Sequence, residues 1–208
     1  MDPGTDWVGS ESKIALDFDG TDDHIVLPTI TLSSYYSISF WAILRGAGPG
    51  IVIGDSVQSS TYIWLYPGNN FRCDINGTVS MQDGTQTVFS SWTHYCVTIG
   101  QDANPVNKSG KIYRNGRLTH GPVALATPTF AITRLATGRI GNQFYFNGNI
   151  DDVRIYDREL PASEVNVLAL RRGIAYETVR NRRGKKATAG GTFKAAWARK
   201  PAQIIGGR

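Results

Sequence analysis

The sequence predicts an all-β fold built from two antiparallel sheets packed as a sandwich. About a dozen short runs rich in aromatic and β-branched residues follow one another at a spacing of roughly ten residues. Clusters of Gly, Asn, Asp, Pro and Ser, which are the residues that turns prefer, separate these runs. Only one short stretch, close to residue 160, is typical of a helix.

Alternation of apolar and polar residues predicts the strands in the first half of the chain. Residues 14–19 alternate strictly, and the turn residues at 20–23 separate them from a second strand at 24–27. The run at 36–44 is longer, and glycines and a proline at 46–50 end it. Shorter strands are predicted at residues 51–53, 61–66, 71–75, 87–89 and 92–99.

The second half of the chain contains the strongest hairpin signal. Asn115-Gly116 lies between strand-like residues 111–114 and 117–119, and a two-residue turn of this kind requires positive φ at both positions. Further strands are predicted at residues 131–135 and 139–140, whereas residues 1–10 form a polar lead.

The stretch GNIDDVRIYDREL, residues 148–160, is predicted to be a strand because its residues alternate between two faces. One face carries Ile150, Asp152, Arg154 and Tyr156. The other face carries Asp151, Val153, Ile155 and Asp157. Residues 160–165 then turn the chain into a short helix.

The length and composition indicate a globular protein. The 208 residues allow one domain or two small ones. A sandwich of about 170 residues can bury a core without disulfides or metals to stabilise it. No run approaches the roughly 18 apolar residues of a membrane span. The first residues lack the basic flank and apolar segment of a signal peptide. Neither a membrane span nor a signal peptide is therefore predicted.

The two cysteines, Cys73 and Cys96, both fall in strand-like runs. Their spacing fits neither a CxxC pair nor a zinc pattern. Two buried free thiols are the favoured interpretation, because free cysteine behaves as a small apolar residue, and a disulfide is the alternative.

Charge divides the chain into residues 1–170 and a basic C-terminal arm, residues 171–208. The arm has eleven basic residues and one acidic residue, hence a charge of +10, while residues 1–170 carry −5. The arm lacks a sustained period and contains many glycines, so by itself it is expected to be disordered. We expect it to dock on other subunits through Arg171, Arg172, Arg180, Arg182, Arg183, Lys185, Lys186, Phe193 and Trp197.

Six blocks carry a family resemblance, in the order LDFDGTDDHIVLP, YSISFWAIL, WTHYCVTI, KIYRNGRLT, GRIGN and GNIDDVRIYDREL. In this order they resemble the laminin-G-like, concanavalin-A-like jelly rolls, over roughly residues 12–170. The resemblance implies an antiparallel two-sheet jelly roll, in which residues 148–160 form the closing strand, related to legume lectins, pentraxins and certain glucanases. It does not settle the function, because one fold supports binders, enzymes and spacers.

Catalysis is not predicted. Glucanases of this fold class carry a Glu-x-Asp-x-x-Glu run, which places carboxylates about 5–5.5 Å apart across the scissile bond. No such run occurs here, and Asp151 and Asp152 are adjacent, so they are expected to point to opposite faces. The three histidines are not part of a nucleophile motif.

A structural calcium ion is one expectation. Asp17, Asp19, Asp22 and Asp23 cluster at a turn, and calcium prefers carboxylate and carbonyl oxygens. The resemblance implies that residues matching Asp19 and Asp151 can contribute to such a site. Capping of the turn by the aspartates is the alternative.

Glycan binding is the other expectation, because it is common in the family and requires exposed aromatic rings beside polar groups. Tyr62, Trp64 and Tyr66 share one face of a strand, and the polar residues Asn69, Asn70 and Arg72 follow them, of which Asn70 is the preferred sugar contact. Alternatively, Trp64 lines the core, where Trp41 and Trp92 are also assigned. Weaker candidate sets are Tyr35 with Tyr36, and Tyr145 with Asn142 and Asn147.

A jelly roll with an Arg- and Gly-rich terminal arm also resembles lectin-like structural proteins of tailed bacteriophages. The sequence thus predicts a non-enzymatic virion protein, decorating the capsid or associated with the tail, whose arm binds virion proteins or copies of itself. Many copies on one particle would turn weak sugar contacts into firm ones. The alternatives are a free carbohydrate-binding lectin and, less favoured, a protein that contacts nucleic acid through the arm.

Overall fold

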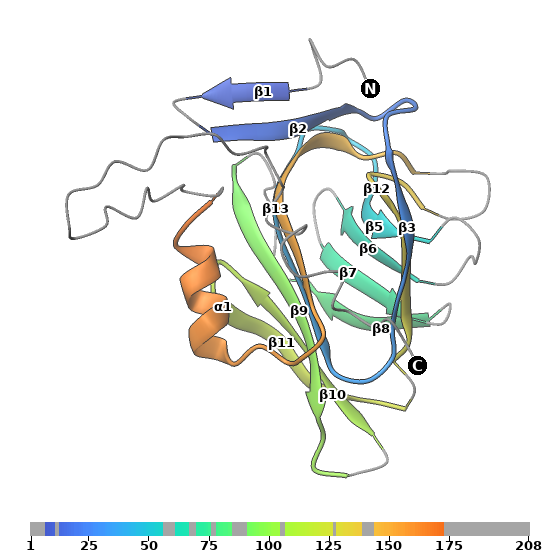
Figure 1. The fold of residues 1–208 in the computed structure, drawn as a ribbon, viewed down its shortest axis with the longest axis vertical. Coiled ribbons are helices and arrows are strands. Elements are labelled where there is room, and N and C mark those ends of the chain that lie inside the picture. Colours follow the sequence, from blue (N-terminus) through green and yellow to red (C-terminus); the bar gives the residue numbers. More distant parts are fainter. Residues whose placement is uncertain are drawn as a thin grey trace, which may run out of the picture.

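In the part of the chain that the computed structural model describes, two antiparallel sheets pack face to face and one short helix lies outside them (Figure 1). The structure describes residues 7–10, 13–55, 61–66, 70–75, 78–84, 91–104, 107–126, 128–138 and 144–172. Within these ranges, no helix is long and apolar enough to cross a membrane.

The larger sheet has seven strands and contains both the first and the last strand of the chain. Its order is β1 (Trp7–Ser10), β2 (Lys13–Asp19), β13 (Asn147–Tyr156), β4 (Tyr36–Leu44), β9 (Thr93–Gln101), β10 (Lys108–Arg114) and β11 (Arg117–Leu125). The closing strand β13 therefore lies between β2 and β4, where it is antiparallel to both.

The smaller sheet has six strands. Its order is β3 (Ile25–Leu32), β12 (Phe130–Leu135), β5 (Gly50–Gly54), β6 (Tyr62–Tyr66), β7 (Asn70–Ile75) and β8 (Thr78–Asp83). The predicted two-sheet jelly-roll fold is confirmed. Sequence alternation missed β1, which was interpreted as a polar lead, and also β8. The strands expected at 87–89 and 139–140 lie outside the described residues.

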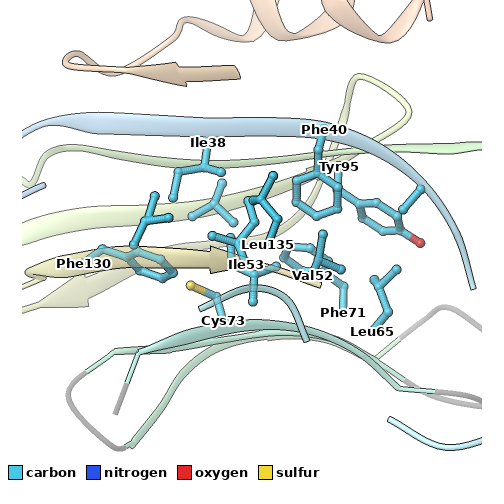
Figure 2. Packing of buried hydrophobic residues seen from close by; sticks show 14 of the residues in the cluster. Ile38, Phe40, Val52, Ile53, Leu65, Phe71, Cys73, Tyr95, Phe130 and Leu135 are labelled. Atoms are coloured by element: carbon cyan, nitrogen blue, oxygen red, sulfur yellow. The ribbon is translucent and has the colours of Figure 1, made fainter. Parts of the chain in front are cut away.

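The core between the sheets is built from alternating apolar side chains of both layers (Figure 2). A stack of three aromatic rings spans it: the ring centroid of Tyr95 lies 5.6 Å from that of Phe40 and 4.9 Å from that of Phe71. Phe71 belongs to the six-stranded sheet and the other two rings to the seven-stranded sheet, so the stack joins the two layers. Stacked aromatic pairs of this kind add to the stabilisation from burial.

The two cysteines are free and buried, as the sequence analysis favoured. Cys73 lies in the core between the sheets, whereas Cys96 faces outward from β9 into a separate cluster beneath the helix. Burial raises the pKa of both thiols. Because a thiol is reactive only as thiolate, both cysteines are expected to be chemically inert.

A β-bulge interrupts the alternation of β13. Asp151 pairs with Trp41 and Arg154 pairs with Ser39, so two residues of β13 oppose one residue of β4. Asp152 adopts φ 50°, and both of its carboxylate oxygens accept hydrogen bonds from Arg154, at 2.7 and 2.8 Å. Ile150 therefore points into the core before the bulge, whereas Val153 and Ile155 pack against the core after it. The prediction of unbroken alternation along 148–160 is wrong for this reason.

The predicted helix forms as α1 (Ala162–Ala169) and covers the outer face of the larger sheet beside β9 and β11 (Figure 1). Leu160 and Val165 bury their side chains against Cys96 and Tyr113. The hydroxyl of Ser37 fixes the preceding turn: it donates to the carbonyl of Arg158 and accepts from the amide of Leu160, both at 2.9 Å.

The prediction that Trp41 and Trp92 belong to the core is wrong. Both are only partly buried and lie outside the core clusters. Trp41 is opposite Asp151 and His94 in the register of the larger sheet, on the side that faces away from the smaller sheet. Its ring packs on that of His94, with the centroids 5.4 Å apart. Aromatic and β-branched composition identifies a strand but not which of its faces is the inner one.

We expect the stability of the fold to depend on the protonation of His94. The imidazole is fully buried, and its Nε2 lies 2.9 Å from the Ser39 hydroxyl. Burial, aided by the charge of Arg154, lowers the pKa of His94 from 6.5 to about 4. The unfolded chain thus binds a proton in this interval that the folded chain does not. The free energy of unfolding is expected to decrease as the pH falls from 6.5 to about 4, by on the order of 3 kcal/mol.

Urea unfolding at a series of pH values measures this effect. His94→Gln, which cannot be protonated, is expected to remove most of the decrease, whereas His24→Gln, on an exposed turn, is expected to retain it. Parallel pH profiles of the wild type and the His94→Gln variant would contradict this prediction.

Candidate functional site

The predicted aromatic residues of β6 lie on the outer face of the smaller sheet. Tyr62, Trp64 and Tyr66 alternate with Ile63 and Leu65, which point into the core. The three rings form a separate cluster, in which the centroid of Trp64 lies 5.5 Å from that of Tyr62 and 5.7 Å from that of Tyr66. The alternative interpretation, that Trp64 lines the core between the sheets, is therefore wrong.

Most of this aromatic cluster is covered. Tyr62 and Trp64 are only 3% and 5% exposed, and Tyr66 is half-buried. Phe144, which precedes β13, packs on it, with its ring centroid 4.9 Å from that of Trp64. Phe144 is itself 37% exposed. The rings available to a ligand are therefore Tyr66, which was predicted, and Phe144, which was not.

A polar pair on β7 lies beside these rings. In the sheet register, Arg72 is opposite Trp64 and Asp74 is opposite Tyr62. The guanidinium of Arg72 lies 6.0 Å from the Trp64 ring centroid and donates two hydrogen bonds to Asp74, of 2.6 and 2.8 Å. The hydrogen bonding to Asp74 raises the pKa of Arg72. A guanidinium held in this way is pre-oriented, so its remaining N–H donors keep a fixed direction.

We call the surface formed by Tyr66, Arg72, Phe144 and the edge of Trp64 the aromatic face. The sequence placed Arg72 close to the predicted rings, but no local signal identified Phe144. The side chain of Asn70, the fourth predicted glycan residue, lies outside the described part of the structure, although its backbone pairs with Tyr66.

A pocket of about 400 Å³ adjoins the aromatic face at one end of the sandwich. Its lining residues are Gly20, Gly46, Ala47, Gly48, Pro49, Phe144, Tyr145 and Asn147. Two of these, Tyr145 and Asn147, belong to a weaker set predicted from sequence, whose third member, Asn142, is outside the described residues. The Asn147 side chain donates a 2.7 Å hydrogen bond to the Asp19 carbonyl and thus joins the pocket to the β2–β3 turn.

The other predicted aromatic set, Tyr35 and Tyr36, does not form a binding surface. Tyr36 is buried in the core. Tyr35 is exposed, but its ring is occupied by the ammonium group of Lys108, 4.4 Å from the ring centroid.

The acidic turn, which comprises Asp19, Asp22 and Asp23, brings three carboxylates together. One oxygen from each lies within 4.8 Å of the others. The same carboxylates also cap the turn: Asp19 accepts from the amide of Thr21 at 2.7 Å, and Asp23 accepts from the amide of Asp19 at 3.2 Å. Three carboxylate oxygens would satisfy part of the six to eight ligands that calcium takes.

The structure does not bring Asp151 to this turn. Asp19 is opposite Asn147 in the register, and Asp151 lies four residues farther along β13, or about 13 Å at 3.3 Å per residue. Asp151 instead faces Arg172, with Oδ2 and Nη1 3.3 Å apart. The distance between Asp151 and the acidic turn depends on the long-range pairing of β2 with β13, which the local sequence does not reveal.

Arg172 fixes the base of the C-terminal arm to the sandwich. Its guanidinium lies 3.9 Å from the ring centroid of Trp92, and its side chain is only 12% exposed. The preceding residue, Arg171, is exposed. The remaining predicted arm residues lie outside the described part of the chain: Arg180, Arg182, Arg183, Lys185, Lys186, Phe193 and Trp197.

Three of the carboxylates in and just after β13 are engaged in ion pairs. Besides the Asp151–Arg172 pair, Asp152 is paired with Arg154, and Glu159 accepts a 2.7 Å hydrogen bond from the ammonium group of Lys111. These groups therefore stabilise the sheet and its connection to α1.

Sequence comparison matches residues 19–166 to the family described as the concanavalin A-like lectin/glucanases superfamily. No curated protein sequence matches the chain.

Several solved structures share the fold at low sequence identity. A native heptameric SAP-like pentraxin from Limulus polyphemus has a TM-score of 0.59 at 15% identity, over 78% of this chain and 84% of the pentraxin. Domain 4 of AbnA, a GH43 extracellular arabinanase from Geobacillus stearothermophilus in complex with arabinotriose, has a TM-score of 0.56 at 21% identity, over 78% and 80%. The sialidase CBM40 from Ruminococcus gnavus bound to α2,3-sialyllactose has a TM-score of 0.51 at 10% identity, over 71% and 97%.

Proposed function

Because this chain belongs to the concanavalin A-like lectin/glucanases superfamily, we propose that it is a non-enzymatic carbohydrate-binding protein. The observation that carries this proposal is the aromatic face, where partly exposed rings lie beside a pre-oriented arginine. Carbohydrate ligands combine apolar C–H surfaces with hydroxyl groups, and this face offers groups suited to both.

Tyr66 and Phe144 would pack against the C–H face of a sugar ring, and Arg72 would donate hydrogen bonds to its hydroxyl groups. Asp74 holds the guanidinium in place through two hydrogen bonds, so little rotamer freedom remains to be lost on binding. The phenol of Tyr66 can both donate and accept.

The neighbours of the fold support the binding of sugars. Domain 4 of the arabinanase is in complex with arabinotriose, and the sialidase CBM40 is bound to α2,3-sialyllactose. The ion pairs of Asp151, Asp152 and Glu159 support a role without catalysis, because a glycosidase requires one carboxylate as acid and another as nucleophile or base.

We further propose that the acidic turn binds a structural calcium ion. Asp19, Asp22 and Asp23 would supply carboxylate ligands, and backbone carbonyls and water would complete the shell. The cation would offset the repulsion among three carboxylates held close together and so stabilise the turn that contacts Asn147.

We also propose that the basic arm attaches the domain to a large assembly, namely a tailed-bacteriophage virion, as a capsid decoration or tail-associated protein. The support is the charge of the arm, +10 against −5 for residues 1–170, together with the fixed position of Arg172 at its base. Virion proteins or further copies of this chain would be the partners. A free lectin, or an arm that contacts nucleic acid, is the competing possibility that the experiments below distinguish.

Arg72→Ala and Tyr66→Ala are each expected to weaken sugar binding about tenfold, by removing a hydrogen-bonding group and a stacking ring respectively. A glycan array screened at millimolar sensitivity identifies the ligand, and titration calorimetry measures the dissociation constants. Tyr35→Ala is a matched control, because it removes a partly exposed tyrosine close to Lys108 of the other sheet. No binding of any glycan by the wild type would refute the proposed function.

Calcium is expected to raise the melting temperature of the protein, and a chelator to reverse the rise. Asp22→Asn with Asp23→Asn removes two ligand charges and is expected to abolish the response. Asp102→Asn, which alters another turn aspartate, is expected to leave the response intact. A melting temperature that does not change on chelation, with no metal copurifying, would sink the calcium proposal.

Removal of residues 173–208 is expected to abolish attachment to particles while sparing the fold and sugar binding. The cut retains Arg172 and thus its contacts with Trp92 and Asp151. Mass spectrometry of purified particles from cells that produce either form measures attachment. Equal recovery of both forms would contradict the anchoring role.

Mobility shifts with duplex DNA at physiological salt test the nucleic-acid alternative, because phosphate contacts depend steeply on salt.

A further inference from the structure

The pocket beside the acidic turn is not required for the sugar contacts described above, yet it is continuous with the aromatic face. Phe144 belongs to both: its ring packs on Trp64 at 4.9 Å, and it lines the pocket together with Tyr145. A ligand that extends beyond the aromatic face would therefore meet the pocket directly.

We propose that this pocket is a second sugar subsite, so that the protein binds along an uncharged oligosaccharide chain of three or more units and not only one terminal sugar. This inference rests on the proposed carbohydrate-binding function and assigns its ligand class. The pocket volume of about 400 Å³ lies within the range of roughly 300–1,000 Å³ that is usual for small-molecule sites.

The chemistry of the pocket lining suits sugar hydroxyl groups. Gly20, Gly46 and Gly48 carry no side chains, so main-chain groups form this part of the wall; the amide of Gly46 donates to the carbonyl of Asn147 at 3.2 Å, and the side-chain amide of Asn147 adds a further polar group. Tyr145 contributes an aromatic ring, whose centroid lies 6.1 Å from that of His24. The ring and the main-chain groups provide the same combination of apolar and hydrogen-bonding surface as the aromatic face.

The charges around the two surfaces select against anionic sugars. Gly20 lies within the acidic turn, whose three carboxylates leave a net charge of −1 beside the pocket even when the proposed calcium ion is bound. At the other end, the positive charge of Arg72 is compensated by Asp74. A carboxylated or sulfated sugar would thus be repelled at the pocket and would gain little affinity from Arg72. An uncharged sugar chain would not be repelled.

The backbone at Phe144 is an independent sign of a specialised role. This bulky residue has φ 57°, in the left-handed region that non-glycine side chains rarely adopt. Its carbonyl accepts a 3.0 Å hydrogen bond from the amide of Ile51, which holds it in place. Strained residues of this kind concentrate where ligands bind. The strain places the ring between the two surfaces.

Gly48, which lines the pocket, can accept a side chain without a clash. A Cβ atom at this position would meet no heavy atom within 4 Å, and its backbone is not among those with positive φ. Gly48→Trp therefore adds a large side chain to the pocket wall, and Gly48→Ala is its matched control. Tyr145→Ala removes the pocket ring instead. Thermal melting establishes that each variant is folded.

The experiment is titration calorimetry with uncharged arabino-, xylo- and malto-oligosaccharides of one to six units. We expect the wild type to bind one of these series at least tenfold more tightly at four units than at one or two. Gly48→Trp and Tyr145→Ala are expected to abolish this gain but to change binding of the short sugars less than twofold. Gly48→Ala is expected to retain the gain, and Arg72→Ala to weaken short and long chains alike.

Two outcomes would overturn the inference and leave the carbohydrate-binding function standing: no gain of affinity with chain length in the wild type, or an unchanged gain in both pocket variants. Tight binding of anionic sugars alone would also overturn it. Absence of binding to every sugar, charged or uncharged, would instead refute the proposed function itself.

Discussion

The insertion of β13 between β2 and β4 is the constraint on which the rest of the structure depends. Pairing on both edges unites the beginning of the domain with its end in the larger sheet. Gly148, at the start of the strand, passes so close to β4 that a Cβ atom there would lie 2.0 Å from the carbonyl oxygen of Ile43. Farther along, the bulge at Asp152 lets Val153 and Ile155 reach the core while Arg154 faces outward.

The same strand determines where the candidate binding surfaces form. Both described ends of the connection from β12 to β13, residues 136–138 and 144–146, are held by backbone hydrogen bonds: the amide of Ala136 donates to the carbonyl of Val52 at 2.9 Å, and the amide of Phe146 donates to the carbonyl of Ala136 at 2.8 Å. Phe144, just before β13, packs on Trp64 and lines the adjoining pocket together with Tyr145. The strand pattern alone places all three rings of β6 on one face of the strand. In the folded protein the exposed surface is the smaller aromatic face with its adjoining pocket.

The charged groups of the chain are divided between two roles. Ion pairs such as Asp152–Arg154 and Asp74–Arg72 hold side chains in fixed orientations, and Arg172 connects the arm to the sandwich through Asp151 and Trp92. By contrast, the acidic turn concentrates carboxylates at the end of the sandwich. Partly exposed pairs contribute little to stability individually, so their importance here is the positioning of neighbouring groups.

The sequence by itself determined the fold class, the Asn115-Gly116 hairpin, the helix after β13, the shared face of Tyr62, Trp64 and Tyr66, and the basic arm. These follow from local periodicity, turn chemistry and charge, which nearby residues specify. Only the tertiary structure decided that Phe144 covers Trp64, that Asp19 and Asp151 are separated, and that Trp41 faces outward. Each of these depends on which distant strands pair and in which register, and a period of two identifies the faces of a strand without revealing what lies against them.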